Sequence, residues 1–217
     1  MFAHLRRWIF WLTVAVIVLA TAVAVVTPHH PNVARPILAL ELAHTWAELS
    51  ILLAIDRSPY WWNTRIDFAF LAAYTALFTL LAFQVARGHW RWALAGLALA
   101  AGLADLKENL AILRVLPRES FENEMAQAIR QWSLAKWGLL GVTWVALGVA
   151  QYRAWVPGAL YAVAGALTLW GCLDHRWIEI AMGPLAVALL WQLYAYWPWR
   201  RAASWRSRAT ASGSSVG

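Results

Sequence analysis

The sequence predicts an all-α protein, a polytopic bundle of about six transmembrane helices with one amphipathic helix at the membrane interface. Two observations favour this fold class. Hydrophobic residues make up 62% of the 217-residue chain and charged residues only 13%, whereas soluble domains carry about 25% charged residues. Several apolar runs also reach the roughly 20 residues that a helix needs to cross a bilayer.

The first expected span follows Arg6 and Arg7 and extends to about Val26. Its basic start resembles a secretory signal, but its apolar run is longer than the 7–15 residues typical of one, which favours an uncleaved signal anchor. Pro28 and Pro31 then end the helix. The six expected spans cover residues 8–27, 66–86, 92–113, 132–151, 154–172 and 177–197.

Residues 1–201 are expected to form a single helical domain. Most connections between its spans are short, which predicts that successive helices are antiparallel neighbours. The linker 114–131 is longer and polar, and Ser120 could cap a short surface helix there. The tail 202–217 is rich in Ser, Arg, Ala and Gly, a composition typical of a disordered segment.

Segment 36–55 is long enough to span, but it carries Glu41, His44 and Glu48 at positions i, i+3 and i+7. This spacing would place all three on one face of a continuous helix. Three ionisable groups on one span are costly in lipid. The segment is therefore expected to lie at the interface or against the bundle as an amphipathic helix.

The charge distribution favours a topology with both termini in the cytoplasm, because the positive-inside rule places Lys and Arg there. If 36–55 does not span, nine of the 18 basic residues face the cytoplasm, and all 11 acidic residues lie on the opposite side. Because the arginines are scattered over several loops, nucleic-acid binding is a poor explanation for the net charge of +7.

Many aromatic side chains lie near the ends of the expected spans. Many of the 17 tryptophans lie there, where an interfacial aromatic belt belongs. A role for some of them in holding a polyisoprenoid or a sugar stays open as the second interpretation.

A polar constellation is expected inside the bundle. Asp105, Glu108 and Asn109 share one face of their helix, and Lys136 enters the next span from the same side. A Lys136 pair with Asp105 or Glu108 would offset the cost of burying the carboxylates. Lys107 and Arg114 lie nearly opposite Asp105 and are expected to reach the outer surface.

Two further residues are expected near this group. Asp67 lies at the start of the second span, and Tyr74 follows at i+7 on the same face, where its hydroxyl can donate a hydrogen bond inward. The whole group has two interpretations: a functional site, or a clasp that holds helices in register.

Metal and cofactor sites are not predicted. Glu41, His44 and Glu48 share a face, and Asp174 and His175 are nearby candidates, but no zinc-type spacing of His or Cys occurs. Haem would need histidines inside spans. The sequence also lacks a nucleophile elbow and a Gly-rich phosphate loop.

The same residues carry a resemblance to an uncharacterised group of bacterial multi-pass membrane proteins. It runs through Leu40-Glu41-Leu-Ala-His-Thr45, Asp67 to Tyr74, the D-x-x-E-N motif Asp105-Leu-Lys-Glu-Asn109, and Ala135-Lys136. It covers roughly residues 8–150. The resemblance implies a bacterial cytoplasmic (inner) membrane and groups the residues of one site: Glu41, Asp67, Tyr74, Asp105, Glu108, Asn109 and Lys136.

Three functions fit these features. The first is binding or modification of a lipid or isoprenoid in an outward-facing polar pocket, with Asp105 or Glu108 as general acid and Lys136 setting its charge. Glu41, Asp67, Tyr74 and Asn109 would then bind the substrate. The second is a non-catalytic subunit or assembly factor with a membrane-protein partner. The third is a small proton-coupled transporter.

Overall fold

A computed structural model describes residues 2–118, 122–151 and 154–197, and these residues form eight α-helices without a β-strand. Six helices are long and two are short. In chain order they are α1 Phe2–Val26, α2 Pro36–Glu41, α3 Trp46–Leu53, α4 Ser58–Val85, α5 Trp90–Val115, α6 Asn123–Ala150, α7 Trp155–Gly171 and α8 Arg176–Tyr196. Ser120 and the tail 202–217, for which a cap and disorder were predicted, lie outside the described residues.

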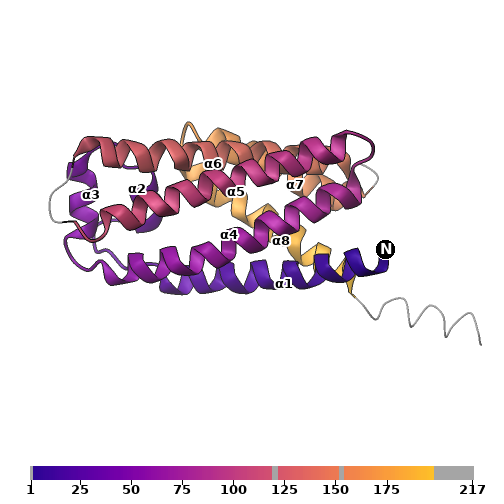
Figure 1. The fold of residues 1–217 in the computed structure, drawn as a ribbon, viewed down its shortest axis with the longest axis horizontal. Helices are drawn as coiled ribbons and strands as arrows, with labels where there is room; N and C mark the ends of the chain where they lie inside the picture. Colours follow the sequence, from indigo (N-terminus) through magenta and orange to yellow (C-terminus); the bar gives the residue numbers. More distant parts are fainter. Residues whose placement is uncertain (1, 119–121, 152–153, 198–217) are drawn as a thin grey trace, which may run out of the picture.

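The six long helices form a closed antiparallel bundle. Each packs against its neighbour in the sequence, and α1 packs against α8 to close the ring. The short helices α2 and α3 lie at one end of the bundle, and the N-terminus lies at the other (Figure 1). The expected antiparallel arrangement of successive long helices is therefore confirmed.

Four helices are long and apolar enough to cross a membrane: α1, α4, α6 and α8. This indicates a membrane protein, but it is fewer than the six predicted spans. Helix α5 is long, yet its second half carries Asp105, Lys107 and Glu108 close together, and α7 has only 17 residues. The physical reasons for the difference are therefore charge in α5 and length in α7.

Segment 36–55 is two short helices rather than the single helix that the spacing predicts. Helix α2 ends at Glu41, and α3 begins after Thr45, whose hydroxyl accepts a hydrogen bond from the Glu48 backbone N–H at 3.3 Å. The Glu48 carboxylate accepts one from the His44 N–H at 2.7 Å. This reciprocal capping stabilises the start of α3 and separates Glu41 from His44 and Glu48.

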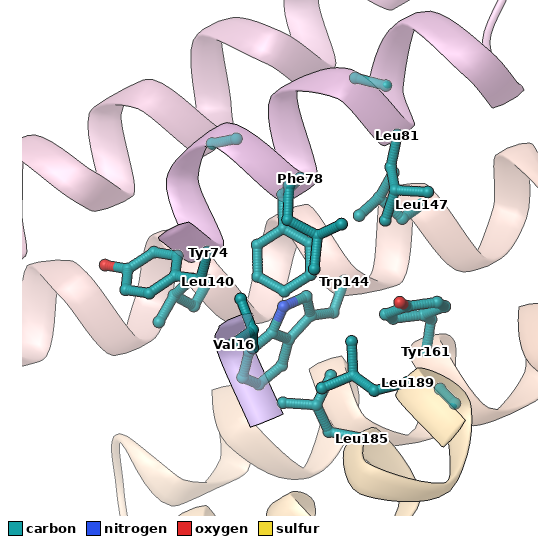
Figure 2. Packing of buried hydrophobic residues seen from close by; sticks show 14 of the residues in the cluster. Val16, Tyr74, Phe78, Leu81, Leu140, Trp144, Leu147, Tyr161, Leu185 and Leu189 are labelled. Carbon is teal, nitrogen blue, oxygen red and sulfur yellow. The ribbon is translucent and has the colours of Figure 1, made fainter. Parts of the chain in front are cut away.

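A large apolar core fills the half of the bundle near the chain ends. Phe78, Trp144 and Tyr161 meet there from three helices, with Phe78 edge-on to both of the other rings. Figure 2 shows Tyr74 at the edge of this cluster, with its hydroxyl pointing away from Phe78 and Trp144. Tyr74 therefore marks the boundary between the apolar core and the polar residues beyond it.

Candidate functional site

Lys136 of α6 lies at the centre of a cluster of carboxyl groups. Its Nζ is 2.8 and 3.0 Å from the two carboxylate oxygens of Glu108, 3.3 Å from Glu41 Oε1 and 3.6 Å from Asp105 Oδ1. Asp105 and Glu108 project from α5, and Glu41 comes from the last turn of α2. The cluster thus joins three helices around one ammonium group.

The remaining predicted residues form two more hydrogen bonds, one to the cluster and one between Asn109 and Asp67, which line one cavity with Glu41. Tyr74 of α4 donates to Asp105 Oδ2 at 2.7 Å. Asn109 of α5 donates through Nδ2 to Asp67 Oδ2 of α4 at 2.6 Å. All seven residues that the sequence groups together therefore lie around one site in the structure. What they do there stays a prediction.

The sequence did not single out two residues of α6 that complete the cluster. Ser133 and Trp137 donate hydrogen bonds to Glu41 Oε2 at 3.2 and 3.0 Å. Ser133, Lys136 and Trp137 stand at i, i+3 and i+4, so they share a helix face. That spacing could have placed Ser133 and Trp137 beside Lys136. The position of Trp137 near the end of an apolar run instead predicts a place in the interfacial belt.

The cluster is buried and has more acidic than basic groups. Glu108 is 1% exposed, Asp105 3% and Lys136 6%. A buried charge is tolerated where it is paired and hydrogen-bonded, and Lys136 can neutralise only one of the three carboxylates around it. Positive charge from protons or from a ligand must balance the remaining carboxylates. The site therefore carries an excess of buried carboxyl groups over basic groups.

A small cavity of ≈ 50 Å³ lies beside the cluster, among α1, α2, α4 and α5. Glu41 is shared by the cluster and the cavity. Asp67 is half-buried where it lines this space. The other lining residues are Val23, Ile37, Leu40, Tyr60, Asn63, Thr64, Asn109 and Ile112.

The weak metal-binding pattern does not assemble. Glu41 is buried, whereas His44 and Glu48 are exposed beyond the helix break, and Asp174 and His175 are exposed between α7 and α8. Over the described ranges, no group of three or more His, Cys, Asp or Glu side chains is placed to hold a metal ion. Lys107 and Arg114 are exposed on the outer surface of α5, as expected.

A second polar network, which the sequence did not reveal, closes the ring. Tyr161 of α7 donates to Gln192 Oε1 of α8 at 2.8 Å, and Gln192 Nε2 donates to Thr13 Oγ1 of α1 at 2.8 Å. Hydrogen bonds of this kind hold membrane helices together by about 0.6–2 kcal/mol each. This network contains no ionisable cluster and joins α1, α7 and α8 structurally.

No family model, curated protein or solved structure matches this chain. The resemblance to the bacterial group with the D-x-x-E-N motif therefore stays a prediction, and the assignment of a function depends on the geometry of the site.

Proposed function

We propose that all six long helices cross a bacterial cytoplasmic membrane. Exposed tryptophans support this placement because they occur toward both ends of the bundle, as interfacial belts do. Trp177 at the start of α8 and Trp197 directly after its end are both exposed, and a helix of the about 20 residues that separate them rises about 30 Å. That length equals the thickness of a typical hydrocarbon core.

The proposed orientation has both termini in the cytoplasm. Arg6, Arg7, Arg87 and Arg91 lie at the end of the bundle that holds the N-terminus, which the positive-inside rule assigns to the cytoplasm. Helices α2 and α3 then lie at the outer face. Lys136 is four residues after the exposed Trp132, so it lies about 6 Å inside the outer belt.

The site in this placement is proposed to bind the polar headgroup of a lipid or isoprenoid from the outer leaflet. The observation that carries the proposal is the buried cluster of carboxyl groups with one Lys close to the depth of the headgroups. Ionisable groups inside a membrane are costly to bury, so their presence favours a functional site. Asp105 and Glu108 are the proposed acids for any proton transfer to the ligand, and Lys136 sets their charge balance.

Mass spectrometry of the protein extracted in native membrane nanodiscs tests headgroup binding. Wild type is expected to retain one lipid class that Asp105→Asn loses, while Lys107→Gln, which changes an exposed residue of the same helix, retains it. Equal lipid profiles for wild type and Asp105→Asn would remove the proposal. A protein partner that copurifies with both variants would favour the subunit or assembly-factor function.

A second candidate, proton-coupled transport, is favoured by the excess of carboxyl groups over Lys136. Proton uptake by proteoliposomes under an applied membrane potential tests it, because a transporter would acidify the lumen in wild type and not in Glu108→Gln. The same slow leak in both would count against this candidate.

A further inference from the structure

The cavity beneath α2 has a polar lining that its neighbours do not satisfy. Tyr60 of α4 is 2% exposed, and its hydroxyl group has no hydrogen-bond partner among the described residues. An unpaired buried polar group of this kind destabilises the folded protein. Tyr60 lines the cavity together with Asn63, Asp67 and Asn109, which suggests that a bound species supplies the missing partner.

The groups that remain available in the cavity are mainly oxygen acceptors. Asn63 Nδ2 already donates to the Val23 carbonyl at 3.0 Å, and Asn109 Nδ2 donates to Asp67 Oδ2 at 2.6 Å. The amide oxygens of both asparagines and Asp67 Oδ1 accept no hydrogen bond from a described residue. A lining of carboxylate and carbonyl oxygens suits a hard cation.

The charge of the cavity favours a monovalent ion. Lys136 lies within ion-pair distance of Glu41, Asp105 and Glu108, whereas Asp67 forms no ion pair within the part of the chain that the structure describes. Asp67 therefore adds one more carboxylate to carboxyl groups that already outnumber Lys136. A single positive charge beside Asp67 would neutralise this carboxylate without disturbing the contacts of Lys136.

The size of the cavity agrees with a small ion. A space of ≈ 50 Å³ exceeds the about 10–15 Å³ that one water molecule needs, so it has room for a small cation with one or two waters. A lipid headgroup does not fit in it. The occupant is therefore distinct from the lipid or isoprenoid proposed above.

We propose that this cavity is a binding site for one small monovalent cation, held by Asp67, the amide oxygens of Asn63 and Asn109, and the Tyr60 hydroxyl. The cation is an alkali ion such as Na⁺ or a primary ammonium group, since both present one positive charge to oxygen acceptors. Helix α2 covers the site through Ile37, Leu40 and Glu41, so the ion is enclosed at the outer end of the bundle.

Equilibrium binding of ²²Na⁺ to the full-length protein in detergent, with choline as the inert cation, tests this site. We expect saturable binding of about one ion per chain, with an affinity that falls about tenfold or more in Asp67→Asn because the carboxylate proposed to bind the ion is lost. Tyr60→Phe is expected to weaken binding by about threefold, a change of ~0.7 kcal/mol. Asp174→Asn, an exposed carboxylate at the same end of the bundle, is expected to bind as wild type does.

Competition identifies the ion, and a folding control separates binding from stability. Displacement of ²²Na⁺ at a lower concentration of methylammonium than of unlabelled Na⁺ assigns the site to an ammonium group, and the reverse order assigns it to an alkali ion. Size-exclusion profiles monitor folding, and Tyr60→Phe provides the readout if Asp67→Asn does not fold. Absence of saturable binding of either cation to wild type, or equal affinities in wild type and both site variants, would overturn the proposal. Neither result depends on the lipid that copurifies.

Discussion

Lys136 is a buried basic residue that is surrounded by carboxyl groups. Its ammonium group contacts three carboxyl groups from two other helices, and its side chain is 7% exposed. Removing one partner of a buried ion pair leaves an uncompensated charge, which costs about 3–5 kcal/mol. This cost arises whether the cluster is a functional site or a clasp.

We therefore expect Lys136→Met to lower the free energy of unfolding by about 3–5 kcal/mol. Lys107→Met is the matched control, because Lys107 belongs to the helix that supplies Asp105 and Glu108 but is exposed, and its change is expected to stay within about 0.5 kcal/mol. Reversible unfolding in mixed SDS and mild detergent measures both. Similar unfolding curves for the two variants would mean that the pairs around Lys136 contribute little.

Residue types and spacing were enough to predict the members of the cluster. Asp105, Glu108 and Asn109 share a helix face by spacing alone, and an ionisable group inside an apolar run needs a partner. The sequence could not identify Tyr60 or Asn63, because nothing local distinguishes a buried aromatic or amide from an exposed one. Their environment depends on the packing of α2 over α4.

At the scale of elements, the break between α2 and α3 is what brings Glu41 into the site. A continuous helix would hold Glu41, His44 and Glu48 on one face, whereas the capped start of α3 lets Glu41 alone turn inward. The sequence contained this capping signal in Thr45 and Glu48. The helical spacing of Glu41, His44 and Glu48 predicts one continuous helix instead, because the spacing of charged residues does not reveal a capped break between them.

The contact between α6 and α7 depends on glycines. The sequence predicts close packing at the glycines within spans, and a Cβ built on Gly165 would lie 2.5 Å from the Gly141 carbonyl oxygen and 2.6 Å from the Val145 nitrogen. Both atoms belong to the backbone, so neither can move aside without shifting a helix. By contrast, a Cβ on Gly138 meets nothing within 4 Å.

Gly165→Ala is accordingly expected to destabilise the protein by about 1–3 kcal/mol through overpacking. Gly138→Ala should leave stability unchanged or raise it by up to about 1 kcal/mol, because alanine has the higher helix propensity. Thermal melting followed by tryptophan fluorescence compares the two variants. A lower melting temperature for Gly138→Ala than for Gly165→Ala would contradict the packing at this contact.

For the whole molecule, the length of the apolar runs predicts the helical bundle, and the ionisable residues within these runs predict the position of the site. The number of membrane crossings does not follow from either. Helix α5 places Asp105 and Glu108 inside, against Lys136, and exposes Lys107 and Arg114. Pairing lowers the cost of crossing for the inward charges, and exposed Lys and Arg can reach the interface. The composition of α5 alone does not reveal the ion pairs of Asp105 and Glu108 with Lys136, since these pairs form only when the helices assemble.

The short connections on either side of α6 distinguish six crossings from four. In the proposed orientation, with the N-terminus in the cytoplasm, Arg118 lies on the outer side and Ala154 in the cytoplasm if α5 and α7 cross. If only α1, α4, α6 and α8 cross, these two positions exchange sides. In a Cys172→Ser background, Arg118→Cys is expected to react with a membrane-impermeant maleimide on intact cells, and Ala154→Cys only after permeabilisation. Both positions are exposed.

His89→Cys and Asp174→Cys serve as references in the same experiment, because in the proposed orientation they lie in the cytoplasm and outside, respectively, under either arrangement. The opposite labelling of Arg118→Cys and Ala154→Cys, with the references unchanged, would establish four crossings. It would place the α5–α6 connection, which joins the two helices that supply Asp105, Glu108 and Lys136, in the cytoplasm. Helices α2 and α3 pack beside that connection, against α6, so a four-crossing chain would have to separate α6 from the helices that complete its site. The buried Glu41–Lys136 pair therefore argues for six.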